Sequence, residues 1–267
     1  MQSSLVTRTT VGNGTAGESM VGLSSNKKSS SPIGRNRECS TCELRSLRMF
    51  CNLNQAALAD FQKLGVKRFL PRGTRLFQED QPSTGVFLLC TGQVKLSCTS
   101  REGKTLILKI ALPGDVLGLG AVISDTKYEV TAEVIEPAEI KNIRRQEFLE
   151  FLEKHGEASL HAAKSLSEEY KTAFFDARRL ALSGSAAERL ASVFLDWART
   201  ASCGKPEMRF TMALTHEELA NMVGSSRETI TRVISKFKRD KIIQIRGASI
   251  IVLDPLKLEQ LASMQLL

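Results

Sequence analysis

The stretch from Thr215 to Arg246 constrains the fold more than any other part of the chain, because two helical patterns meet there at a break. Leu219 and Met222 mark the inward face of a short helix that ends near Gly224. Ser226 is a suitable N-cap for a second, longer helix. The inward face of this second helix consists of Ile230, Val233, Ile234 and Phe237. A glycine joint between two such helices predicts a helix-turn-helix.

The outward side of the second helix is basic. Between Gly224 and Arg246 there are seven Lys or Arg residues against two acidic ones, which argues against an ordinary solvated face. Long side chains in the first turns of a helix can reach base edges in a major groove, and lysines further along contact phosphates. A two-stranded wing is predicted over residues 242–244 and 250–253. The predicted DNA-binding residues are Ser226, Arg227, Glu228, Thr231, Arg232, Lys236 and Lys238.

The run Gly224-Ser-Ser-Arg-Glu-Thr-Ile-Thr-Arg232, followed by an isoleucine-rich wing with Arg246-Gly247, resembles the winged helix of the Crp/Fnr family of bacterial transcription regulators. The resemblance implies that bases are read by Arg227, Glu228 and Arg232. The loop at residues 100–104 resembles a surface that family members present to RNA polymerase. A charged β-turn is the alternative interpretation of that loop.

Length and charge limit the classes of protein that fit. The chain of 267 residues is long enough for about two domains, at ~100 to 200 residues per domain. A net charge of +8 favours an anionic partner. No apolar run approaches the roughly 18 residues of a membrane-spanning helix, and the N-terminus has no apolar signal segment. We therefore expect a cytoplasmic protein with no membrane partner.

Three of the six cysteines lie close together, at Cys39, Cys42 and Cys51. A CxxC pair brings two sulfurs to one centre, and thiolates suit zinc or iron–sulfur clusters. The segment, read as a helix running to residue 64, resembles the cluster-binding region of the oxygen-sensing Fnr branch. That branch holds a 4Fe-4S cluster with three clustered cysteines and a distant fourth. Zinc binding, thiol redox chemistry and a purely structural role are the alternatives.

The fourth cysteine is missing from its expected place. The family position falls at Lys141, and a lysine cannot replace a thiolate. Cys90 or Cys98 could complete the set, although both lie in runs that predict strands, where a buried cysteine usually acts as a small hydrophobe.

Between residues 66 and 144 the pattern changes to short alternating runs separated by turn residues, which predicts an antiparallel roll or barrel. The turn Pro113-Gly114-Asp115 followed by Gly118 resembles the cyclic-nucleotide-binding β-roll. Turns are also predicted at residues 91–92 and at Pro137. The predicted strands are 66–70, 75–78, 86–90, 93–100, 105–111, 128–134 and 138–144.

The resemblance to this roll does not extend to its cyclic AMP ligands. Members that bind cyclic AMP place a Glu directly after the glycine that corresponds to Gly118, and an Arg-Ser pair further along for the phosphate. Leu119 and Val130-Thr131 occupy these positions here, and of them only Thr131 could still meet a phosphate oxygen. A cyclic phosphate buried without a cation costs several kcal/mol. We therefore expect that cyclic AMP is not the effector.

From residue 146 to about residue 183 the pattern is helical, with a stripe of residues spaced alternately three and four apart. Such a stripe predicts a two-stranded seam, and the family resemblance implies a homodimer through this helix. The alternative is that the stripe packs on the roll. The predicted dimer residues are Leu160, Ala163, Tyr170, Phe174, Ala177 and Ala181.

Taken together, these patterns predict an α+β fold: an N-terminal antiparallel β-roll of the double-stranded β-helix or jelly-roll kind, a long dimerisation helix and a C-terminal winged helix-turn-helix. The predicted parts are a disordered tail (1–36), a cysteine-bearing lead-in and β-roll sensor (37–146), the dimerisation helix (147–183) and the DNA-binding domain (184–267). The predicted function is a transcription regulator that binds a palindromic operator as a dimer and contacts RNA polymerase. The alternatives are a nucleotide- or redox-regulated enzyme and a protein-binding adaptor. The chain has no recognisable catalytic triad, phosphate loop or carboxylate pair that favours the enzyme.

Overall fold

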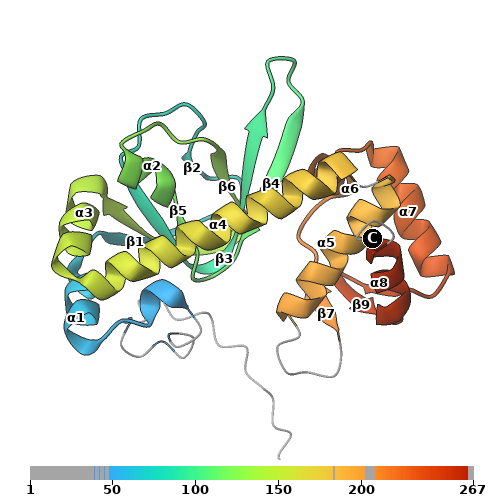
Figure 1. Ribbon diagram of the computed structural model, residues 1–267. Coiled ribbons are helices and arrows are strands. Elements are labelled where there is room, and N and C mark those ends of the chain that lie inside the picture. Colours follow the sequence, from blue (N-terminus) through green and yellow to red (C-terminus); the bar gives the residue numbers. More distant parts are fainter. Residues whose placement is uncertain are drawn as a thin grey trace, which may run out of the picture. The chain divides into compact units, whose positions relative to one another are not determined.

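A computed structural model describes residues 39, 42, 45, 48–182, 184–201 and 208–263. The tail predicted over residues 1–36 lies outside this part of the chain. Figure 1 shows a strand-rich N-terminal region, a long helix α4 and a C-terminal region of short helices with a small sheet. None of the described helices is long and apolar enough to cross a membrane.

The N-terminal region is an antiparallel sheet, as predicted. Its strand order is β1-β6-β3-β4, with β2 paired to β6 and β5 paired to β3. The strands are β1 (Val66–Leu70), β2 (Arg75–Phe77), β3 (Gly85–Thr99), β4 (Thr105–Ala111), β5 (Val116–Leu117) and β6 (Thr131–Arg144). A short helix that the sequence analysis missed, α2 (Leu119–Ser124), follows β5.

The turns predicted at residues 91–92 and at Pro137 are wrong. Both positions lie inside single long strands, β3 and β6, whose pairing shifts register around residues 89–94. Gly92 has a φ of +82°, and a Cβ there would lie 2.5 Å from the carbonyl oxygen of Pro137. Glycine and proline thus mark facing bulges, which bend a strand without ending it.

The cysteine segment and the helix after it are separate elements, so the single helix predicted up to residue 64 is also wrong. A 3₁₀ turn, η3 (Met49–Cys51), precedes α1 (Gln55–Lys63). Asn54 begins α1 as its N-cap, because its side-chain oxygen accepts a hydrogen bond from the Ala57 N–H at 3.0 Å. The chain therefore turns between the thiols and α1.

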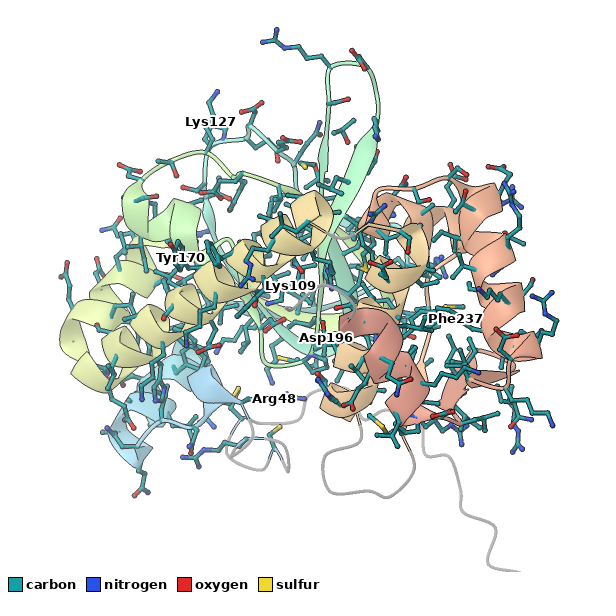
Figure 2. All side chains as sticks on the ribbon, turned by 45° about the vertical axis from the view of Figure 1, so that its right-hand side comes forward. Arg48, Lys109, Lys127, Tyr170, Asp196 and Phe237 are labelled. Carbon is teal, nitrogen blue, oxygen red and sulfur yellow. The ribbon has the colours of Figure 1, made fainter. Side chains whose placement is uncertain are left out.

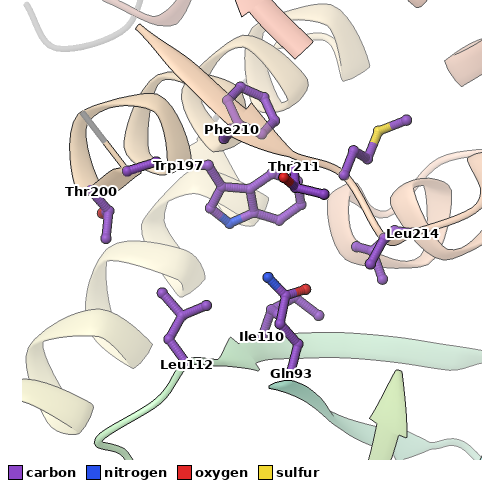
Figure 3. A pocket seen from close by; sticks show the side chains of 11 residues that line it. Gln93, Ile110, Leu112, Trp197, Thr200, Phe210, Thr211 and Leu214 are labelled. Carbon is purple, nitrogen blue, oxygen red and sulfur yellow. The ribbon is translucent and has the colours of Figure 1, made fainter. Parts of the chain in front are cut away.

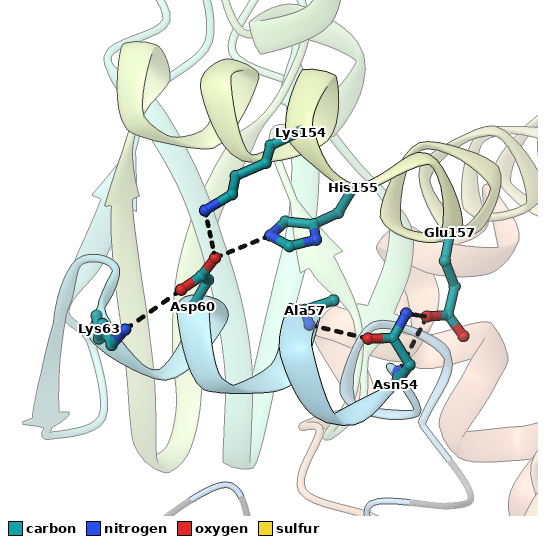
Figure 4. Close-up of polar contacts among 7 residues, drawn as sticks. All are labelled: Asn54, Ala57, Asp60, Lys63, Lys154, His155 and Glu157. Atoms are coloured by element: carbon teal, nitrogen blue, oxygen red, sulfur yellow. Dashed lines mark hydrogen bonds and ion pairs between the residues drawn. The ribbon is translucent and has the colours of Figure 1, made fainter.

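Polar contacts tie α1 to the point where α3 (Arg145–Lys154) meets α4 (Gly156–Leu182), as Figure 4 shows. The Asn54 N–H and side-chain amide both donate to Glu157 Oε2, at 2.9 and 2.7 Å. Asp60 Oδ2 lies 2.7 Å from Lys154 Nζ and 3.1 Å from His155 Nε2. Hydrogen bonds from Lys154, and then from Lys63 and His155, hold the pKa of Asp60 well below its usual range. The carboxylate is therefore charged at neutral pH.

The C-terminal region is a winged helix-turn-helix, as predicted. Its helices are α5 (Ala186–Ala201), α6 (His216–Val223), α7 (Arg227–Arg239) and α8 (Pro255–Ser263). Its sheet has the order β7-β9-β8, formed by β7 (Arg209–Thr211), β8 (Ile243–Arg246) and β9 (Ser249–Val252). Phe194, Leu219 and Phe237 are among its core residues, each 1% exposed or less, and Phe237 is labelled in Figure 2. The wing hairpin β8–β9 starts within a residue of its predicted bounds.

Candidate nucleic-acid interface and lead-in thiols

Local interactions fix both ends of the helix-turn-helix. Thr215 and Glu218 form a capping box at the start of α6: the Glu218 N–H donates to the Thr215 hydroxyl at 3.2 Å, and the Thr215 N–H donates to the Glu218 carboxylate at 2.9 Å. Gly224 ends α6 with a φ of +60°, a conformation that strains any other side chain. Ser226 then caps α7 by accepting the Thr229 N–H at 3.2 Å. These local interactions therefore define both ends of the turn, and Arg189 of α5 adds hydrogen bonds to the carbonyls of Val223 and Gly224.

The predicted DNA-binding side chains share the solvent side of α7. Ile230, Ile234 and Phe237 are buried, whereas the seven predicted residues, from Ser226 to Lys238, are all exposed. One face of the helix thus carries the core and the other carries Arg227, Arg232, Lys236 and Lys238 with a single acid, Glu228. The net positive charge of this face suits contact with a phosphate backbone. The reading of bases by these side chains stays a prediction.

Two of the predicted base-reading groups already have defined hydrogen bonds. The Thr231 hydroxyl donates to the Arg227 carbonyl at 2.9 Å and lies 2.9 Å from His216 Nδ1, a residue that sequence reasoning missed. This leaves the Thr231 methyl group for contact with a base. The pKa of Glu228 is lowered, first by a hydrogen bond from the Glu228 backbone N–H to the carboxylate and then by one from the Ser226 side chain. Glu228 is therefore a carboxylate that can only accept hydrogen bonds.

The lead-in thiols, Cys39, Cys42 and Cys51, lie against the roll. Cys39 and Cys51 are buried, and both belong to the hydrophobic cluster that contains Phe50 and Leu88. Cys42 is half-buried, with its sulfur 3.9 Å from Arg48 Nη1. The structure thus brings two of the three predicted ligands into one apolar core.

Of the two candidates for a fourth thiol, Cys90 is the one that packs on this core. Cys98 belongs to none of the described hydrophobic clusters, and its S–H points to the Leu106 carbonyl of β4. Burial raises the pKa of Cys51 to about 11 and that of Cys90 to about 12. Both are therefore neutral thiols at pH 7 unless a metal replaces the proton.

Lys141, at the position where the family resemblance expects the fourth cysteine, performs a different task. Its side chain is 2% exposed, and its ammonium donates to the carbonyls of Phe61 and Gln62 in the last turn of α1. Nζ also lies 4.6 Å from the centre of the Phe61 ring. Burial lowers the pKa of Lys141, and the α1 carbonyls offset the loss of water. Lys141 thus joins β6 to the end of α1.

The positions that would hold a cyclic nucleotide belong to the core. Leu119 is 1% exposed, and Val130 packs against the inner cluster of the roll. The Thr131 hydroxyl accepts the Glu79 N–H at 3.1 Å, so it is already engaged. None of the three residues offers a cation for a phosphate.

The predicted dimer stripe on α4 is exposed in the single chain. Leu160, Tyr170 and Phe174 are 54%, 72% and 54% exposed, and Figure 2 shows Tyr170 on α4. The face of α4 turned to the rest of the chain instead carries the buried residues Ala158 and Ala162. The alternative, a stripe packed on the roll, is therefore wrong for the described chain.

Comparisons with known proteins cover both halves of the chain. The Crp-like helix-turn-helix domain matches residues 188–261, and the cyclic nucleotide-binding domain matches residues 67–155. The transcriptional activatory protein AadR of Rhodopseudomonas palustris is 28% identical over 228 residues, which is 84% of this chain and 93% of AadR. The transcriptional activator protein anr of Pseudomonas aeruginosa is 26% identical over 233 residues, 85% of this chain and 93% of anr.

A similar fold occurs in the solved structure of FixK2 from Bradyrhizobium japonicum. It has a TM-score of 0.67 at 21% identity and covers 74% of this chain and 97% of FixK2. At this identity the likeness concerns the fold alone.

Proposed function

The chain belongs to the Crp/Fnr family of DNA-binding transcription regulators, and from this premise we propose that it binds a palindromic operator as a homodimer. Because the family consists of transcription regulators and not of enzymes, membership argues against the alternative of a nucleotide- or redox-regulated enzyme. The observation that carries the proposal is the exposed face of α7, where five cations (Arg239 besides the four predicted ones) and one carboxylate lie opposite an apolar inward face. We propose that Arg227, Glu228 and Arg232 read bases, with Thr231 beside them. Ser226, Lys236 and Lys238 would contact phosphates and so orient the protein on the duplex.

The exposed stripe of α4 supports the dimer. Soluble proteins seldom leave several large apolar side chains exposed along one helix unless another surface covers them. A twofold pair of α4 helices would cover Leu160, Tyr170 and Phe174 and would present two copies of α7 to successive major grooves. Within the segment 147–183, predicted as one dimerisation helix, α3 ends at Lys154 and α4 alone would form the seam. The segment would then lie between a sensor (37–146) and a DNA-binding domain (184–267).

We also propose that the sensor responds to a redox or oxygen signal through the lead-in thiols, and not to cyclic AMP. The route from the thiols to the dimer helix is short. Phe50, next to Cys51, has its ring centre 6.4 Å from that of His161 on α4. Asn54, three residues after Cys51, bonds to Glu157 in the first turn of α4. We propose that a change at Cys51 reaches the start of α4 through these contacts.

An iron–sulfur cluster fits this site in the kind of donor it needs. Cys39, Cys42, Cys51 and Cys90 would hold it, while Lys141 would remain as a nearby cation bound to α1. When bound, the cluster would supply iron that changes its charge on oxidation. Among the described residues, no three His, Cys, Asp or Glu side chains already form a group that could hold a metal ion. Binding would therefore draw the thiols together around the cluster.

Anaerobic purification followed by an absorption spectrum and iron, sulfide and zinc analysis tests the sensor. We expect a brown protein that air bleaches, with weaker dimerisation afterwards. Cys90→Ser should lower the iron content, whereas the matched control Cys98→Ser should leave it unchanged. A colourless, metal-free protein that binds its operator equally well with Cys39, Cys42 and Cys51 all changed to serine would remove the sensing proposal and leave the DNA-binding one intact.

A gel shift of the full chain against genomic DNA fragments tests the DNA-binding proposal. A discrete complex that resists non-specific competitor DNA is expected, and its absence would favour the adaptor alternative.

We further propose that the protein acts in the cytoplasm and that the exposed turn at residues 100–104 contacts RNA polymerase.

A further inference from the structure

A pocket of about 290 Å³ lies between the roll and the C-terminal region. We call it the joint pocket. Gln93, Ile110 and Leu112 line it from the roll, and Trp197, Thr200 and Phe210 face them from α5 and β7 (Figure 3). The Trp197 and Phe210 rings meet edge to face, with centres 5.7 Å apart. The volume of the joint pocket lies just below the roughly 300 to 1,000 Å³ typical of small-molecule sites.

The walls of the joint pocket are held by contacts outside it. Lys95 Nζ of β3 lies 2.9 Å from Glu218 Oε1 of α6 and 3.3 Å from Glu133 Oε1 of β6. Ile107 and Ile135 of the roll belong to the same hydrophobic cluster as Leu190 and Phe194 of α5. The pocket therefore lies beside a hydrophobic cluster and an ion-pair network that connect the roll to the C-terminal region.

The lining defines the chemistry of an occupant. The described lining residues include no charged side chain, which disfavours nucleotides and other anions. Within the described part of the chain, neither the Trp197 indole N–H nor the Gln93 side-chain amide has a hydrogen-bond partner. In Figure 3 the Gln93 amide points into the pocket, and the indole nitrogen faces the side formed by Leu112 and Gln93. Two N–H donors between aromatic and aliphatic walls suit a flat ring that carries one acceptor oxygen.

We propose that the joint pocket binds a small, neutral, flat molecule with a carbonyl oxygen, and so forms a second effector site, apart from the lead-in thiols. The carbonyl accepts hydrogen bonds from Trp197 and Gln93. The ring packs between Trp197, which has Phe210 behind it, on one side and Ile110 and Leu112 on the other. This site goes beyond the proposed thiol sensor and needs neither metal nor cyclic nucleotide.

The only tryptophan in the sequence, Trp197, gives a direct reporter. In the full chain labelled with 5-fluorotryptophan, 1-indanone should shift the single ¹⁹F resonance saturably. Indane, the same ring system without the carbonyl, should bind about 25-fold more weakly, the effect of losing two neutral hydrogen bonds at about fivefold each. The 5-carboxylate of 1-indanone should not bind detectably, because its charge has no partner in the pocket.

Variants locate the site. Gln93→Leu should weaken 1-indanone about fivefold and leave indane unchanged, since only the ketone uses the amide. Leu112→Phe, which fills the pocket, should abolish both shifts, whereas Leu108→Phe on the same stretch, outside the lining, should abolish neither. The proposal is overturned if 1-indanone gives no saturable shift, if the carboxylate binds as well as the ketone, or if Gln93→Leu weakens indane equally. A cooperative thermal unfolding transition like that of the wild type, followed by circular dichroism, shows that each variant is folded. Operator affinity without ligand, measured on the same samples, tests the DNA-binding proposal separately.

Discussion

Replacing Glu228 with alanine is expected to relax operator preference at one base pair by about 1 to 3 kcal/mol, because the carboxylate can accept a hydrogen bond from one base and rejects bases that offer only acceptors. The lowered pKa of Glu228 keeps this group ionised over the whole range in which the protein would be assayed. Affinity for random DNA should change little, or even rise, because a negative charge leaves the interface.

Lys236→Ala is the matched control, since Lys236 lies on the same helix and is also exposed. It should weaken binding to every sequence alike and reduce the salt dependence, measured as the slope of log affinity against log salt, by about one unit. Competition binding with operators altered one base pair at a time separates the two effects. Matching changes in sequence preference for the two variants would mean that α7 is only a basic surface.

The second large effect is expected at the α4 stripe, where Phe174→Asp should break the dimer. The ring is 54% exposed in the single chain, and a buried, unpaired carboxylate in a twofold seam is strongly unfavourable. Losing the second half-site should lower affinity for a palindrome on the order of 100-fold or more, because the two contacts no longer reinforce each other. Affinity for an isolated half-site should stay the same.

Phe175→Asp provides the control, because Phe175 is 60% exposed but lies outside the three-and-four spacing of the stripe. Sedimentation velocity should show a monomer for Phe174→Asp and a dimer for Phe175→Asp. If both variants stay dimeric, another surface forms the dimer. If both become monomeric, the seam is wider than the stripe.

Much of this fold follows from local sequence patterns. The helix-turn-helix could be placed because Thr215, Gly224 and Ser226 act on their immediate neighbours through caps and one left-handed residue. The strands were harder to delimit. Gly92 and Pro137 carry ordinary turn signals, and only the pairing of β3 with β6, over 40 residues apart, makes them facing bulges.

The proposed sensor site depends on contacts that no local pattern contains. Cysteine spacing identifies Cys39, Cys42 and Cys51, but the choice between Cys90 and Cys98 requires knowing which of the two packs on the cluster that contains Cys39 and Cys51. From the sequence, position 141 is predicted only as the place where a fourth thiolate is missing. Its bonds to the α1 carbonyls became visible with the fold, and so did the link from Asn54 to Glu157. The joint pocket likewise combines residues about 100 positions apart, which periodicity cannot bring together.

Selection of binding sites from random DNA with the full-length protein tests the central claim most directly. We predict an inverted repeat whose half-sites each contain a G·C-bearing core, because Arg227 and Arg232 offer guanine-type donors and Glu228 a cytosine-type acceptor. The half-site centres should lie about one helical turn apart. Recovery of sequences with no palindrome, or of no enriched sequence at all, would contradict the account.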